Sequence, residues 1–328
     1  MATTADVARM AGVSTATVSH VINGTRKVRE ETRRLVEEAI EATGYSPNTL
    51  ARSLATASTR SIAVVMSAIT NPYFGQVLQG VESEAVRHGY TLLLADSRDD
   101  PDHELHLVRG MHERRVDGII LAASAVPKRT LEYLSAHELP VVLADRLVDD
   151  HYDQVGADNA EPTAELVDHL AHRGHRRIGL VAGRRGLATT EERVRGFREG
   201  LRRNDLEPDP DLLAEGHSLT ESAVEATRRL LDHRPTALIT ANNGMTIGAM
   251  QALGEAGLRV PADIALVGFD DFLWAEWFAP RLTVIAQPCG DIGTEAARLL
   301  LRRIGAPGVE PETHRLPSRF VHRDSCGC

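Results

Sequence analysis

Short apolar runs that alternate with amphipathic helical segments constrain the fold of this 328-residue chain more than any other feature. Strands buried on both faces of a parallel sheet have such runs, because helices cover both faces. The pattern from residue 60 on therefore predicts two doubly wound parallel sheets, which form two subdomains. Ligands of such sheets bind beyond the carboxyl ends of the strands, so the cleft between the subdomains is the predicted site. The runs lie at 61–66, 91–95, 118–121 and 140–145 in the first series, and at 178–181, 237–240 and 264–268 in the second.

The first sixty residues have a different pattern, which predicts three short helices. Thr3-Thr4-Ala5-Asp6 has the spacing of a capping box, so a helix is expected to start after Thr3 and to end at Gly12. Ser14 is expected to cap a second helix over 15–22. A third helix is predicted over 30–43, with Leu35, Val36, Ala39 and Ile40 facing inward and Gly44 following its end.

Two short helices joined by a glycine turn, with a third packed across them, form a helix-turn-helix unit. Its second helix enters the major groove of DNA. On pattern alone, the alternative is a three-helix unit whose polar face contacts only solvent. The distribution of charge favours contact with DNA. Residues 1–60 contain eight Lys/Arg and six Asp/Glu and so have a net charge of +2. Because the whole chain has a net charge of −9, the remainder has −11. A mildly basic head on an acidic body suits local contact with DNA.

The head also resembles a known family over some fifty consecutive residues, including AGVS (11–14), TVSHVIN (17–23), ETR (31–33) and YSPN (45–48). This stretch is similar to the head of the LacI family of bacterial repressors. The resemblance implies that Thr15, Ala16 and His20 read base edges. It further implies that phosphates are contacted by Thr17, Ser19, Asn23 and Arg26, which position the head without reading sequence.

The segment from Pro47 to about Thr56 resembles the hinge of the same family. The resemblance implies that Ala51, Arg52 and Leu54 belong to a short helix that folds on operator DNA, paired with its copy from a second subunit. Leu54 would then wedge into the minor groove and kink the DNA. The alternative is a plain linker helix with Leu54 packed on the body.

The body resembles the periplasmic-binding-protein-like core of the LacI family. Its landmarks are NPYF (71–74), RVDG (115–118), DN (158–159), RVRGF (193–197), GFDD (268–271) and QP (287–288). By position, the resemblance implies that Arg193 donates to an effector, Asp270 accepts from it and Asn242 does both. Tyr73 and Phe74 would line one wall, with Asp145, Asp158 and Gln287 at the rim.

Two departures from the family bear on the effector. After Gly216, where several relatives have a stacking aromatic residue, this chain has His217-Ser218-Leu219. Leu187 stands where a purine-responsive relative would have a second arginine. A carbohydrate is therefore the expected effector, with a nucleobase or another non-sugar ligand as the alternative. Stacking from another side is expected from the local aromatic cluster Phe272, Trp274, Trp277 and Phe278.

Rival classes of function find little support in the sequence. An enzyme is not expected, because the chain has no P-loop, nucleophile elbow or zinc-protease motif, and the adjacent pairs Asp149-Asp150 and Asp270-Asp271 would point apart on extended backbone. A solute-binding protein would have a signal peptide where this chain has its helix-turn-helix. Cys326 and Cys328 could bind a metal, but no second pair has ligand spacing, so neither a metal nor another cofactor is expected.

These observations predict a sequence-specific transcriptional regulator of the cytoplasm, most simply a repressor, with no membrane-spanning segment. A homodimer is expected on a roughly palindromic operator, with affinity controlled by a small ligand, either as inducer or as corepressor. The expected domains are a head (1–46), a hinge (47–59), a body (60–322) and a tail (323–328). Within the body, the first subdomain takes 60–158 and 289–322, and the second takes 159–288.

Overall fold

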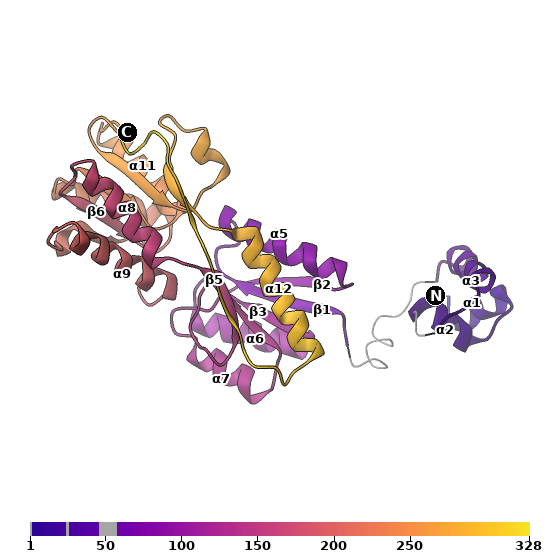
Figure 1. The fold of residues 1–328 in the computed structure, drawn as a ribbon. Helices are drawn as coiled ribbons and strands as arrows, with labels where there is room; N and C mark the ends of the chain where they lie inside the picture. Colours follow the sequence, from indigo (N-terminus) through magenta and orange to yellow (C-terminus); the bar gives the residue numbers. More distant parts are fainter. Residues whose placement is uncertain (1, 24–25, 46–57) are drawn as a thin grey trace. The chain divides into compact units, whose positions relative to one another are not determined.

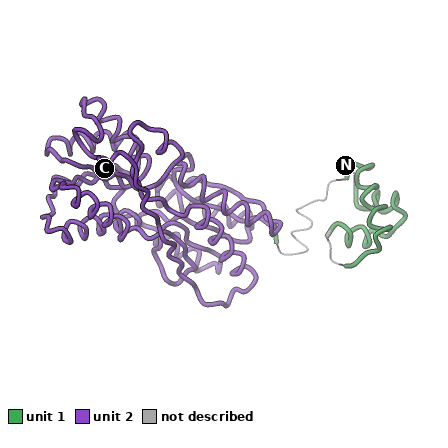
Figure 2. Tube along the Cα trace, turned by 45° about the horizontal axis from the view of Figure 1, so that its top comes forward, with its two compact units in different colours: residues 1–59 green, residues 60–328 purple. Residues whose placement is uncertain are grey.

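The structure is a computed structural model that describes residues 2–23, 26–45 and 58–328. It divides into two compact units, residues 1–59 and 60–328, shown in green and purple in Figure 2. No helix among the described residues is long and apolar enough to cross a membrane. The predicted hinge residues Ala51, Arg52 and Leu54 lie outside the described residues.

The first unit consists of the three predicted helices, α1 (Thr4–Ala11), α2 (Thr15–Asn23) and α3 (Glu30–Thr43). The capping box is present, because the Thr3 side chain accepts from the Asp6 amide while Asp6 accepts from the Thr3 amide. Gly12 and Gly44 follow α1 and α3 in the left-handed conformation that glycine adopts without strain. Val7, Val18 and Val36 meet in the core, whereas Leu35, predicted to face inward, is exposed.

The body contains the two predicted sheets, and each has six strands. The first has the order β11-β5-β4-β3-β1-β2 and is parallel throughout. Its strands are β1 (Ser61–Met66), β2 (Thr91–Asp96), β3 (Gly118–Leu121), β4 (Val141–Ala144), β5 (Asp153–Ala157) and β11 (Thr313–Leu316). The helices that cover it are α5 (Pro72–Arg87), α6 (Pro101–Glu113), α7 (Lys128–Ala136) and α12 (Cys289–Gly305).

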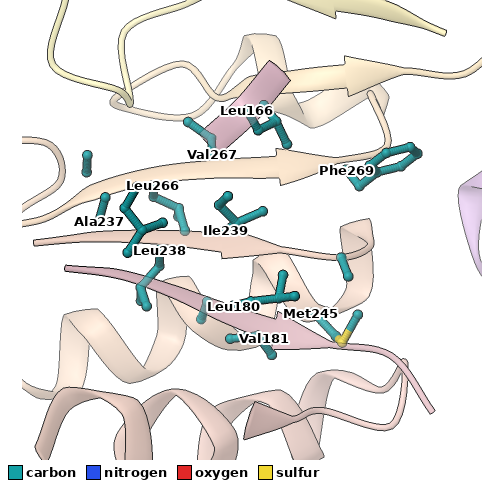
Figure 3. Packing of buried hydrophobic residues seen from close by; sticks show 14 of the residues in the cluster. Leu166, Leu180, Val181, Ala237, Leu238, Ile239, Met245, Leu266, Val267 and Phe269 are labelled. Atoms are coloured by element: carbon teal, nitrogen blue, oxygen red, sulfur yellow. The ribbon is translucent and has the colours of Figure 1, made fainter. Parts of the chain in front are cut away.

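The second sheet has the order β12-β10-β9-β8-β6-β7, with β12 antiparallel to β10. Its strands are β6 (Ile178–Ala182), β7 (Leu213–Glu215), β8 (Ala237–Thr240), β9 (Ala265–Phe269), β10 (Thr283–Ala286) and β12 (Arg319–Val321). Its helices are α8 (Ala160–His172), α9 (Ala188–Arg203), α10 (Thr220–Asp232) and α11 (Asn243–Glu255), with 3₁₀ turns η1 (Pro210–Leu212) and η2 (Leu273–Glu276). Branched side chains of β6, β8 and β9 fill the core between these layers (Figure 3).

Two glycines allow helices α5 and α12 to pack closely against one another. In the first subdomain α12 lies along α5 (Figure 1). A Cβ atom on Gly293 of α12 would lie 1.9 Å from the Val77 carbonyl oxygen, and one on Gly80 of α5 would lie 2.2 Å from that of Gly290. The two backbones can approach this closely only because both positions lack a side chain.

The chain passes between the sheets three times, at 158–159, 287–288 and 317–318 (Figure 1). The third passage corrects one predicted boundary. Residues 319–322 were assigned to the first subdomain, but β12 pairs with β10 of the second sheet. Residues 323–328 continue along that subdomain, where Ser325 and Cys326 are buried. Two hydrogen bonds hold Ser325 in place: its amide group donates to the Arg281 carbonyl oxygen, and its hydroxyl donates to the Leu266 carbonyl oxygen.

Candidate effector cavity and DNA-reading helix

The carboxyl ends of strands from both sheets border one cavity in the body, where a ligand site was expected. Asp145 directly follows β4 and Asp270 directly follows β9, and both line the cavity. The space not filled by atoms, including solvent at the mouth, is about 500 Å³. The lining residues are Ser67, Ala68, Asn71, Tyr73, Phe74, Asp99, Asp145, Arg146, Gly183, Leu187, Thr189, Thr190, Arg193, Ser218, Ala241, Asn242, Asp270 and Gln287.

On the side of the first subdomain, Asp145 and Arg146 organise the polar wall. The Tyr73 hydroxyl donates to Asp145 Oδ1 at 2.6 Å, which fixes both side chains. The buried Arg146 guanidinium donates to Asp99 Oδ1 at 2.5 Å, to Ser67 Oγ at 3.0 Å and to the Ala123 carbonyl oxygen at 2.8 Å. This wall therefore presents carboxylate acceptors beside a fixed guanidinium.

On the side of the second subdomain, Asp270 and Arg193 have the matching roles. Gln287 Nε2 donates to Asp270 Oδ1 at 2.5 Å. Arg193 is only 7% exposed, which argues against a surface ion pair. Its Nε donates to Asn159 Oδ1 at 2.9 Å, its Nη1 donates to the Ala241 carbonyl oxygen, and its guanidinium stacks 3.9 Å from the centre of the Phe269 ring.

Burial and neighbouring charges shift the pKa values of three of these groups. Burial raises the pKa of Asp270, and Arg193 and the Gln287 amide offset only part of that effect. Burial and the nearby Asp145 carboxylate raise the pKa of Tyr73 well above its usual range, so the phenol stays a donor. Burial lowers the pKa of Arg146, but Asp99 and Asp145 more than compensate, so this arginine stays charged.

Seven of the eight predicted effector residues line this cavity: Tyr73, Phe74, Asp145, Arg193, Asn242, Asp270 and Gln287. Asp158 does not. Its backbone bonds to Leu316 and Ser318 at a passage between the sheets, where the main chain is held against β11. Asn242 lines the cavity but also caps α11, because its Oδ1 accepts from the Met245 amide at 2.7 Å.

The expected aromatic stacking is wrong. Trp274 and Trp277 are 53% and 79% exposed, and no member of the cluster Phe272, Trp274, Trp277 and Phe278 lines the cavity. The short turn η2 explains this, because it directs the tryptophans toward solvent while Phe272 packs into the core. Sequence reasoning missed Asp99 and Arg146. Arg146 had a signal, since it stands one residue beyond the Asp145 that ends an apolar run.

Two hydrogen bonds join the subdomains beside the cavity. Asn243 Nδ2 donates to Asn71 Oδ1 at 2.8 Å, and Arg184 Nη1 donates to the Asp99 carbonyl oxygen at 2.8 Å. Each bond pairs a residue of the second subdomain with one of the first. The described conformation is thus one in which the two walls of the cavity are in contact.

The predicted DNA-reading residues lie on α2 of the first unit. Ser14 caps this helix, because its Oγ accepts from the Thr17 amide at 3.1 Å. Thr15, Ala16 and Ser19 are exposed, and Thr17 and His20 are half-buried, while Val18 faces the core. Arg26 is exposed, and Asn23 is the last residue of the helix. The polar side of α2 is thus turned away from the core of its own unit.

Comparison with known proteins finds separate matches for the head and for the body. Residues 3–48 match the family model "Bacterial regulatory proteins, lacI family", and residues 167–326 match "Periplasmic binding protein-like domain". The transcriptional repressor PurR of Aliivibrio salmonicida is 39% identical, and that of Vibrio cholerae 37%. The alignments cover 99% of this chain and 99% and 98% of those proteins.

Solved structures give the same result. A lac repressor dimer bound to operator and the anti-inducer ONPF matches with a TM-score of 0.87 and 30% identity, over 99% of each chain. The transcriptional regulator CelR in complex with cellobiose matches with a TM-score of 0.75 and 32% identity, over 99% of this chain and 100% of that one.

A helix-turn-helix head and a two-sheet body with a polar cavity define a DNA-binding regulator controlled by a small effector. The chain belongs to the LacI family of bacterial regulatory proteins. It is a transcriptional regulator of the repressor type.

Proposed function

We propose that the effector is a small sugar, most simply a monosaccharide, and that its binding in the cavity controls the affinity for operator DNA. The observation that carries this proposal is that a carboxylate and a guanidinium line each wall, Asp145 and Arg146 on one and Asp270 and Arg193 on the other. Each sugar hydroxyl both donates and accepts, so neighbouring hydroxyls can donate to the carboxylate and accept from the guanidinium.

A further acceptor supports a ligand that has several donors. Gln287 Oε1 is buried and has no hydrogen-bond partner among the described residues, although its Nε2 is bonded to Asp270. A buried acceptor without a donor costs roughly 1–3 kcal/mol. A ligand hydroxyl beside Asp270 would remove that cost. Two similar structures contain sugars, the CelR complex with cellobiose and a LacI family regulator of Enterococcus faecium with bound ribose.

A nucleobase is the second candidate, because similarity to the PurR repressors of several bacteria suggests a nucleobase as ligand. The residues that line the cavity argue against a nucleobase. Leu187 is apolar and 2% exposed, and Ser218 replaces an aromatic wall, so a flat base would find aromatic side chains only at Tyr73 and Phe74. Those two rings are nearly perpendicular to one another.

On the DNA side, we propose that Thr15, Ala16 and His20 read base edges and that Thr17, Ser19, Asn23 and Arg26 contact phosphates. A homodimer would place two such helices on a roughly palindromic operator. Ligand binding would change how the two subdomains meet and thereby release DNA, as an inducer does. The protein would act in the cytoplasm and as a regulator rather than as a catalyst.

Isothermal titration calorimetry against D-ribose, other pentoses, hexoses, cellobiose, hypoxanthine and guanine tests the proposal. We expect saturable binding of one monosaccharide and loss of it in Arg193→Ala. Asp263→Asn is the control, because Asp263 pairs with Arg259 at the surface, away from the cavity. Binding of a nucleobase alone would replace the sugar proposal. A sugar that binds but leaves operator affinity unchanged would contradict its role as effector.

A further inference from the structure

Two cysteines and two histidines converge on the outer side of the second subdomain. Cys326 is buried, Cys328 and His322 are exposed, and His169 is half-buried on α8. One ligand atom from each of the four lies within 4.8 Å of the others. None of them lines the effector cavity. The sequence argument against a metal considered only the two cysteines, because ligand-spacing rules do not detect His169, which lies over 150 residues before them in the chain.

The separations are close to those of a tetrahedral site. Cys326 Sγ lies 3.2 Å from His322 Nε2 and 3.2 Å from Cys328 Sγ, and Cys328 Sγ lies 3.5 Å from His169 Nε2. Bonds of about 2.3 Å to sulfur and about 2.0–2.1 Å to nitrogen imply tetrahedron edges of about 3.3–3.8 Å. Small rotations of the His322 and His169 side chains would bring the remaining pairs into this range, because neither ring is fully buried.

A hydroxyl group contacts one of the two sulfur ligands. The Thr283 hydroxyl donates to Cys326 Sγ at 3.3 Å and itself accepts from the Arg323 amide at 2.9 Å. Such donors to a ligand sulfur orient and stabilise a metal site.

The segment that holds the cysteines is fixed by bonds independent of the four ligands. Asp324 pairs with Arg281 at 2.8 Å, the Ser325 hydroxyl donates to the Leu266 carbonyl oxygen at 2.5 Å, and Arg173 Nη2 donates to the Gly327 carbonyl oxygen at 2.9 Å. The ligands are therefore held near their positions before any ion binds, which lowers the entropic cost of binding.

We propose that His169, His322, Cys326 and Cys328 bind one Zn²⁺ ion. Two sulfur and two nitrogen donors in tetrahedral arrangement are the set that Zn²⁺ prefers, and four protein ligands leave no open position for catalysis. The ion is structural. It links the segment after β12 to α8 and so fixes residues 322–328 on the second subdomain.

The test uses the full-length protein with its affinity tag removed, purified under reducing conditions and dialysed against metal-free buffer. Zinc is measured by mass spectrometry in the wild type, Cys328→Ser, His169→Gln and His172→Gln. His172 is the matched control, because it is an exposed histidine on the same helix whose Nδ1 bonds only to the local Asp168 carbonyl oxygen. Both ligand variants alter side chains that are not fully buried, and circular dichroism checks that they are folded.

We expect one zinc per chain in the wild type and in His172→Gln. In Cys328→Ser and His169→Gln the affinity for zinc should fall by more than ~10–100-fold, which is the typical effect of losing a residue that only hydrogen-bonds to a metal ligand. Cobalt substituted for zinc should give the visible bands of a tetrahedral ion and a thiolate charge-transfer band that Cys328→Ser weakens. The proposal is overturned if reduced wild-type protein neither retains zinc nor binds cobalt, or if Cys326 and Cys328 form a disulfide under these conditions instead.

Discussion

Asp145 and Asp270 adopt backbone conformations that most residues avoid. Their φ angles are +69° and +77°, and each follows the last residue of a central strand. A residue other than glycine in this region costs of order 1–3 kcal/mol, although aspartate tolerates it better than most. Hydrogen bonds from Tyr73 and Gln287 hold the two carboxylates in place. Strained residues at the same edge of two sheets indicate a backbone arranged for binding rather than for stability.

Asp270→Asn should weaken effector binding about 10–100-fold, because a hydrogen bond to a charged group contributes roughly 1.5–3 kcal/mol. Calorimetry on the variant and on Asp263→Asn measures the difference. Equal affinity in wild type and Asp270→Asn would remove this carboxylate from the site.

The same substitution should not destabilise the effector-free protein at pH 7. The folded-state pKa of Asp270 is raised above its ordinary value of 3.8, so the charged carboxylate is less favourable in the folded chain than in the unfolded chain. The wild type therefore loses stability as the pH rises through that raised pKa, whereas the uncharged asparagine does not. Urea unfolding should show the advantage of Asp270→Asn at pH 7 and its decline toward pH 4. A variant less stable than wild type at pH 7 would contradict the expectation.

His20→Ala should cost about 1–3 kcal/mol of operator affinity and relax the preference at one position of each half-site. Ser19→Ala, by contrast, should weaken binding equally on all sequences. Selection of bound DNA from a randomised pool distinguishes the two effects. Uniform loss in His20→Ala would mean that His20 contacts phosphate.

At the scale of elements, apolar runs predicted seven strands well, whereas β5, β7, β10, β11 and β12 escaped prediction. The helices of the head and strands β1, β3 and β8 have the predicted bounds or differ by one residue. β5 was missed because it carries Asp153, a fully buried carboxylate that Arg302 and Arg303 of α12 neutralise at 2.7 Å. That compensation comes from about 150 residues away, so no local pattern reveals it. Most of the effector cavity was likewise inferred from family resemblance, not from periodicity.

The contact between α5 and α12 gives a prediction at this scale. Gly293→Ala places a methyl group against the Val77 carbonyl oxygen, and it should destabilise the body by about 1–3 kcal/mol because the helices must separate. Gly290→Ala on the same helix is the control. Apart from its chain neighbours and the backbone of its own helix, no heavy atom of the described residues lies within 4 Å of its added methyl, so it should be neutral or stabilising by up to ~1 kcal/mol. Urea unfolding followed by circular dichroism measures both, and equal stabilities would mean that α12 shifts freely.

At the scale of the whole body, the subdomains are joined by three passages of the chain, by the two bonds beside the cavity and by the ion pair between Arg315 of β11 and Glu192 of α9 at 2.8 Å. An effector that contacts both walls stabilises the arrangement in which those walls touch. This gives coupling between effector and operator a physical basis, and such coupling is typically worth ~1–3 kcal/mol.

Asn243→Ala removes the bond to Asn71 without removing a residue that lines the effector cavity. We expect effector affinity to fall roughly 2–10-fold, the equivalent of one hydrogen bond, while operator affinity without effector changes little. Calorimetry and gel-shift titration measure the two quantities. Unchanged effector affinity would mean that the Asn71–Asn243 bond is equally present with and without ligand.

The three passages also govern the order in which the body can be made. The chain leaves the first sheet after β5 and returns to it only with α12 and β11, after five of the six strands of the second sheet have been made. While the ribosome adds residues 160–288, the inner side of α5 and the outer edge of β5 lack their native neighbours. Domains usually mature from the amino-terminal end as they emerge. Here the amino-terminal half must wait, and the two halves are completed almost together in the last part of translation.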